Sequence, residues 1–185
     1  MNPAIAQGRG RARQSGVTLL EVLVTVLILG FGLIGLVGLQ TKVQIAQADA
    51  YQRAQAVLLV EDMANRISAN RVNAASYVTT TPLGTGDSQP SSCSGLAGAA
   101  LDACEWSAQL HGAAEQSAAG SVGAMIGARG CIAKVGANPP VYQVTVAWQA
   151  MTDLGTPSLP CGAGSYAGEP RRRAIGALVT IAKLS

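Results

Sequence analysis

The stretch Ser15–Gln40 reads SGVTLLEVLVTVLILGFGLIGLVGLQ, and it decides the architecture of this chain of 185 residues. From Val22 to Thr41 there are 20 residues without a charge. An α-helix of that length spans roughly 30 Å, the thickness of the hydrocarbon core of a bilayer. The sequence therefore predicts a helix that crosses a membrane once, with one acid, Glu21, close to its start.

The net positive charge of the chain comes from the segment before this helix. The net charge is +3, and residues 1–16 contain three arginines and no acid, so the rest of the chain is neutral. A basic segment before an apolar helix stays on the cytoplasmic side of the membrane. The later cluster Arg171–Arg173 has no aromatic platform beside it, so we interpret it as a solvated strand entrance and expect no nucleic-acid partner.

The helix is expected to continue beyond the membrane as far as about Arg71. Residues 17–41 form its membrane half, and residues 42–72 form an amphipathic outer half. Acids stand four residues before bases at Asp49–Arg53 and Asp62–Arg66, the favoured order in a helix. Apolar residues recur at steps of three and four and predict a buried stripe of Val43, Ala46, Ala50, Ala54, Val57, Val60, Ala64 and Ile67.

Residues 73–185 predict a small globular α/β domain. Ala74–Ser92 has the composition of a loop, helical spacing predicts a second helix over about Ser94–Gln116, and residues 119–130 are a Gly-rich connection. Alternating stretches predict three strands, near Cys131–Val135, Tyr142–Gln149 and Arg173–Lys183. Sequential strands favour an antiparallel meander packed on the outer half of the long helix, which gives an α+β fold.

Four cysteines, Cys93, Cys104, Cys131 and Cys161, follow the membrane segment. An even number on the exported side predicts two disulfides. A zinc site is the alternative, and the absence of any Cys-x-x-Cys pair argues against it. The meander brings the start of its first strand and the end of its second to one edge, which favours Cys131–Cys161 and leaves Cys93–Cys104. The other two pairings remain open on sequence alone.

No other motif indicates a chemical activity. Gly30–Gly35 matches the Gly-x-Gly-x-x-Gly spacing, but it lies inside an apolar run and not in a βαβ unit. Its glycines either allow helices to approach closely in lipid or are merely tolerated there. His111 is the only histidine, and Asp102 and Glu105 have the appearance of surface charges. We therefore expect no enzyme, metal, cofactor or small-molecule substrate.

Glu21 remains to be explained. A charged side chain in the hydrocarbon core costs roughly 2.5–3.5 kcal/mol on insertion scales, and residues that bear this cost are functional by default. The alternative is that Glu21 lies near the end of the span and reaches the interface.

The segment Gly16–Leu23, with the basic leader before it and the apolar helix after it, resembles the prepilin signature of type IV pilins and type II secretion pseudopilins. The resemblance implies a type IV pilin-like fold and removal of the leader, residues 1–16, by a prepilin peptidase. The cut would fall between Gly16 and Val17, and Val17 would become N-methylated; the family usually has Phe at this position. The resemblance also implies that Glu21 pairs with the terminal amine of a neighbouring subunit, or its own, because a buried unpaired charge costs far more than a pair.

Five segments of the sequence resemble one group of this family, the PilV-like minor pilins or type IV pilus modification proteins. This likeness implies a role in priming type IV pilus assembly, a place at the pilus tip, and other minor pilins and the major pilin as partners. It also implies an inner-membrane protein with its C-terminal domain in the periplasm, which becomes extracellular in the pilus. The matching segments are Glu21–Val24, Gly32–Gln40, Asp102–Trp106, Arg129–Cys131 and Val144–Gln149.

Two other interpretations remain. A minor pseudopilin of type II secretion has the same leader and fold but works in another machine. A secreted domain with a conventional signal peptide would be cut after Ala46-Gln47-Ala48. The second is remote, because the apolar run is longer than the roughly 7–15 residues of such a peptide and begins at an acid.

Overall fold

A computed structural model describes residues 16–182 apart from residues 91, 114–115, 118–119 and 122–124. The chain divides into two compact units, residues 1–44 and 45–185. Helix α1, Leu19–Ala69, begins in the first unit and ends in the second, and every other element belongs to the second unit. Helix α1 contains no proline, and its bounds lie two residues inside the expected Val17 and Arg71.

Within the second unit, α1 buries one side. The expected stripe is partly wrong, because Ala50 and Ala54 are exposed whereas Ala56 and Met63 are fully buried. The expected stripe and the observed buried side both contain alanines. An alanine has so little apolar area that its position does not indicate which side of a helix is covered. The buried residues follow one another at steps of three and four: Gln52, Ala56, Val60, Met63 and Ile67.

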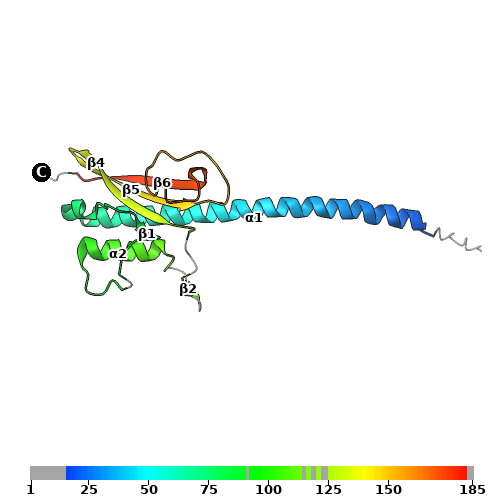
Figure 1. The fold of residues 1–185 in the computed structure, drawn as a ribbon, viewed down its shortest axis with the longest axis horizontal. Helices are drawn as coiled ribbons and strands as arrows, with labels where there is room; N and C mark the ends of the chain where they lie inside the picture. The colour runs from blue at the N-terminus through cyan, green and yellow to red at the C-terminus, as the bar shows by residue number, and fades with distance from the viewer. Residues whose placement is uncertain (1–15, 91, 114–115, 118–119, 122–124, 183–185) are drawn as a thin grey trace, which may run out of the picture. The chain divides into compact units, whose positions relative to one another are not determined.

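A four-stranded antiparallel sheet packs against this side of α1, in the order β1-β4-β5-β6 (Figure 1). Its strands are β1 Leu83–Gly84, β4 Arg129–Ala137, β5 Pro140–Gln149 and β6 Arg172–Thr180. The last three form the expected meander, with Ile132 opposite Val144 and Val144 opposite Ala177. Strand β1 falls in a segment that was expected to be a loop, because two residues are too few to reveal a period.

The connecting segments also contain short elements that were not expected. A 3-10 helix, η1, covers Arg71–Tyr77, and another, η2, covers Glu169–Arg171. Strands β2, Gln116–Ser117, and β3, Gly120–Ser121, pair with each other in a separate sheet.

The second helix, α2, runs over Gly98–Leu110 and ends earlier than expected. Its end is a Schellman motif: the N–H of Gly112 donates to Gln109 O at 2.8 Å, and the N–H of Ala113 donates to Ala108 O at 3.0 Å. Gly112 has φ +83°, a conformation that side chains with a Cβ rarely adopt, so the helix stops there.

Trp106 of α2 joins the helix to the rest of the second unit. Its side chain is fully buried, and its Nε1 donates to Leu59 O of α1 at 2.9 Å. The ring also lies against the β4 backbone at Gly130, where an added Cβ would come within 2.3 Å of a ring atom. Glycine is therefore required at this point of β4, and Trp106 ties α1, α2 and the sheet into one core.

Strand β5 is buried on both faces, whereas the alternating pattern of Tyr142–Gln149 predicts a strand that is buried on one face only, so this implication of the pattern is wrong. Tyr142, Val144, Val146 and Trp148 face the core shared with α1, as their alternation predicts. The residues Thr145 and Ala147 between them are buried as well. The connection from β5 to β6 covers that face, since Cys161 Sγ lies 3.8 Å from Thr145 O.

Arg172 anchors this connection, which corrects the expectation that Arg171–Arg173 is a solvated cluster. The Arg172 side chain is only 3% exposed. Its guanidinium donates to Glu169 Oε2 at 2.7 Å, to Leu159 O at 2.5 Å and to Cys161 O at 3.1 Å. Of the three arginines, Arg172 is therefore the internal one, and its partners come from the connection itself.

The described residues thus form a long N-terminal helix followed by a short helix and a small antiparallel sheet. This is an α+β fold with a pilin-like architecture, as expected from the sequence.

Candidate functional site

The candidate site is the start of α1. Thr18 caps the helix, since its Oγ1 accepts the N–H of Glu21 at 3.3 Å and its carbonyl accepts the N–H of Val22 at 3.2 Å. A threonine three residues before a glutamate is a capping signature that the sequence shows plainly, although Thr18 was not singled out. Glu21 lies in the first helical turn, where the helix dipole favours a negative charge.

The two residues of the expected cleavage site lie just before the helix. Gly16 and Val17 are both exposed, and the Val17 side chain is 70% exposed. A Cβ added to Gly16 would meet no atom within 4 Å. The bond between the two residues is therefore accessible in the described part of the chain.

Glu21 is also exposed. Within the described residues, its carboxylate has no hydrogen-bond or ion-pair partner; only its backbone N–H is bonded, to Thr18. Such an acid is free to accept a partner from another chain.

The described residues of the first unit, 16–44, form no apolar core of their own. Their large apolar side chains from Val17 to Val43 are between 45% and 84% exposed. A Cβ at Gly30, Gly32, Gly35 or Gly38 would likewise meet nothing within 4 Å. The helix is long and apolar enough to cross a membrane by length and composition. A surface that is apolar on all sides is suited to lipid or to a bundle of similar helices.

The second unit has a polar cluster at the other end of α1, around Arg66. Arg66 Nη1 donates to Asp102 Oδ1 at 2.9 Å and to Glu105 Oε2 at 2.6 Å, while its Nε donates to Asp62 Oδ2 at 2.9 Å. Burial disfavours the charged form of Arg66 and so lowers its pKa. The hydrogen bonds to Glu105 and Asp102 outweigh this effect, and the pKa of Arg66 is raised. Tyr77 also donates to Asp102.

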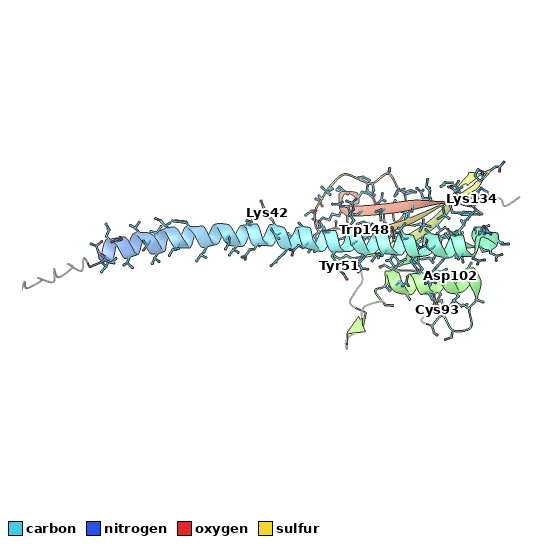
Figure 2. The ribbon with its side chains drawn as sticks, turned by 180° about the vertical axis from the view of Figure 1, so that it is seen from behind. Lys42, Tyr51, Cys93, Asp102, Lys134 and Trp148 are labelled. Carbon is cyan, nitrogen blue, oxygen red and sulfur yellow. A yellow bond between two sulfur atoms is a disulfide. The ribbon has the colours of Figure 1, made fainter. Side chains whose placement is uncertain are left out.

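The expectation that Asp102 and Glu105 are merely surface charges is therefore wrong, because both side chains bind Arg66 of α1. Figure 2 shows Asp102 on the side of α2 that faces α1. Both acids hold α2 to the end of α1, so the cluster positions the two helices.

His111, Asp87 and Ser107 lie together at the end of α2, but their hydrogen bonds do not follow the order of a catalytic triad. Ser107 Oγ donates to Asp87 Oδ2 at 2.5 Å, and His111 Nε2 lies 3.8 Å from Asp87 Oδ1. A nucleophilic serine would have to donate to the histidine instead. Within the described residues, no three His, Cys, Asp or Glu side chains are arranged to hold a metal ion.

Asp87 acts as an acceptor that ties β1 to α2. Besides Ser107, it accepts the N–H of Gly84 at 2.8 Å and the N–H of Gln89 at 3.2 Å. Burial opposes its ionisation, but these hydrogen bonds outweigh burial and lower the pKa of Asp87.

We therefore expect Asp87→Asn to remove part of the acid sensitivity of folding. A lowered folded-state pKa adds stability above the unfolded-state pKa of about 4, and this stability is lost as pH falls through the folded-state pKa. Between pH 6 and pH 3 the wild-type chain should lose about 1 kcal/mol more of its free energy of unfolding than the variant. Urea unfolding in detergent, followed by tryptophan fluorescence, measures this difference. Asp153→Asn, at a 66% exposed side chain, is the control, and an equal slope for wild type and Asp87→Asn would contradict the assignment.

The cysteines form two disulfides, Cys93–Cys104 and Cys131–Cys161, with Cα atoms 5.8 Å and 5.7 Å apart. These are the two pairings that the strand layout favours. The first joins α2 to the loop before it, and the second joins β4 to the connection between β5 and β6.

Comparison with known proteins gives one finding, and it concerns the start of the chain. Residues 11–37 match the family model described as the Prokaryotic N-terminal methylation motif. Neither the curated proteins nor the solved structures contain a match. The motif is found in type IV pilins and pseudopilins, and it covers Gly16, Val17 and Glu21. The start of this chain is thus a type IV pilin-like segment of the kind that prepilin peptidase processes.

Proposed function

We propose that this chain is a PilV-like minor pilin that helps to prime type IV pilus assembly and occupies the pilus tip. Its role is structural and not enzymatic, and its partners are other minor pilins and the major pilin. The observation that carries the proposal is the carboxylate of Glu21, which has no partner among the described residues and lies in the first turn of an uncovered apolar helix, inside the methylation motif.

The start of α1 suits a chain that begins at Val17. The N–H groups of the first helical turn need acceptors, and Thr18 supplies them to Glu21 and Val22. The helix therefore keeps its cap after the leader is removed. The new terminal amine stands one residue before the cap, so a neighbouring chain presents a similar amine to Glu21 when apolar helices bundle.

The proposed pairing follows from the cost of burying charge. A protonated amine enters an apolar bundle at a large cost unless a counter-charge accompanies it. Glu21 supplies that charge and fixes the axial position of one helix relative to the next. Before assembly the same helix anchors the chain in the inner membrane, and the second unit, with its two disulfides, lies in the oxidising periplasm.

The test is the N-terminal residue and the mass of the protein from its native membrane fraction. We expect a chain that begins with Val17 and carries one added methyl group. Gly16→Leu should leave residues 1–16 attached, whereas Gly35→Leu, at a site where an added Cβ also meets no atom, should be processed. A chain that begins at Asp49 would mean cleavage by signal peptidase, and the filament proposal would be wrong.

The second candidate function is a minor pseudopilin of type II secretion, which the same motif favours equally. Proteins that copurify with the membrane form distinguish the two. Minor pilins and the major pilin support the pilus, and a major pseudopilin supports the secretion system.

A further inference from the structure

A pocket of about 310 Å³ opens in the second unit where β5 ends and β6 begins. Asp49 and Arg53 of α1 line it together with Leu154 and Arg173. Trp148 of β5 also lines it, at the end of the sheet beside α1 (Figure 2). The pocket therefore combines three charged side chains with an apolar wall.

The charges of the pocket do not balance. Both oxygens of Asp49 already accept hydrogen bonds, from Met151 N at 3.3 Å and from Thr152 Oγ1 at 3.2 Å. Among the described residues, Arg173 donates only to backbone oxygens, at 2.6–3.2 Å, and these neutral acceptors leave its charge without a counter-ion there. Arg53 is exposed and has no hydrogen-bond or ion-pair partner among the described residues. Two cations thus face one carboxylate, and each oxygen of that carboxylate already accepts a hydrogen bond from Met151 or Thr152.

The apolar wall strengthens any ion pair that forms here. Of the two apolar lining residues, Trp148 is almost completely buried, whereas Leu154 is 63% exposed. An anion that enters between these side chains leaves part of its water, and its attraction to a guanidinium then exceeds that of a surface pair. The occupant therefore needs a negative group and an apolar group side by side.

We propose that this pocket receives an acidic side chain, with an adjoining apolar one, from a neighbouring pilin-like subunit. A guanidinium binds a carboxylate through two parallel hydrogen bonds, and Arg53 has its donors available for this. A volume of about 310 Å³ holds one or two side chains and is too small for the paired acyl chains of a phospholipid. The inference rests on the proposed function, because it names a contact within the assembled filament or its tip complex.

The test uses the full chain in cells, with a photo-crosslinking benzoylphenylalanine at Leu154. The matched control carries the same probe at Leu178 on β6, where the side chain is also 63% exposed. We expect the Leu154 probe to form a crosslink to a second pilin-like chain, next to an Asp or Glu of that chain. Arg53→Glu should reduce this crosslink at least about tenfold, because it sets like charges against each other, and Arg53→Lys should largely retain it.

Three results would overturn the proposal: a yield no higher than at Leu178, a crosslink to lipid, or an Arg53→Glu variant that crosslinks as well as wild type. Arg53 has no partner to lose among the described residues, so Arg53→Lys should unfold at the wild-type temperature, and Arg53→Glu, which sets a like charge four residues after Asp49, only slightly below it. The N-terminal mass of the same samples separates this proposal from the previous one. A methylated Val17 without a crosslink rejects the pocket alone, whereas an unprocessed chain rejects both.

Discussion

Replacing Arg172 with methionine is expected to destabilise the folded chain by about 3 kcal/mol. The arginine is 3% exposed and donates to the backbone oxygens of Leu159, Cys161 and Pro157 as well as to Glu169. Methionine fills much of the same volume but donates no hydrogen bond. The carbonyl groups then lose their donors, which costs about 1–3 kcal/mol for each one that stays buried. Urea unfolding at pH 7, monitored by tryptophan fluorescence, gives the change in the free energy of unfolding.

The neighbouring arginine is the matched control. Arg171 is 49% exposed, and its partner Asp153 is 66% exposed, so Arg171→Met should cost less than about 1 kcal/mol. Arg172→Lys should fall between the two, because an ammonium group keeps the charge but cannot reach the same set of acceptors at once. If Arg171→Met and Arg172→Met lower stability equally, Arg172 does not anchor the connection between β5 and β6.

The long helix and the long strands are predictable because apolar residues recur in each of them with the period of that element. The apolar run and the spacing after it predict α1, and alternation predicts the meander of β4, β5 and β6. Strand β1 has two residues and forms only because β4 offers it an edge at Arg129 and Gly130. The burial of Thr145 and Ala147 depends on a distant connection, so the period of β5 cannot reveal it.

The candidate site, like the meander, is predictable because the residues that define it lie close together in the sequence. Gly16, Val17, Thr18 and Glu21 lie within one short stretch, and their chemistry depends on their order in the chain. Charged residues elsewhere are different, because several of their partners come from distant segments. Arg66 meets Asp102 across 36 positions, and Arg172 meets carbonyl groups of a loop. Sequence alone shows such residues as charges and cannot tell a solvated one from a buried one.

Glu21→Gln is expected to reduce the share of this chain in filaments on the order of a hundredfold, while cleavage after Gly16 continues. Glutamine keeps the size and polarity of glutamate but offers no charge to a terminal amine. An unpaired charge in an apolar bundle costs about 3–5 kcal/mol, which accounts for the size of the effect. Immunoblots that compare sheared filaments with membranes measure the share, in cells where the variant replaces the native copy. Glu21→Asp, which keeps the charge on a shorter side chain, should retain part of it.

Thr18→Ala separates pairing from the simpler role of starting the helix. Thr18 accepts the N–H of Glu21, and its loss should cost about 1 kcal/mol of helix stability while the carboxylate remains. Glu21 in the first turn interacts with the helix dipole, which is worth about 0.3–1 kcal/mol at an exposed site. If Glu21 served only the helix start, both substitutions would therefore have similar, small effects on filament share. Pairing with an amine instead predicts a large loss for Glu21→Gln and a small one for Thr18→Ala, so equal losses would contradict the pairing of Glu21 with a neighbouring subunit.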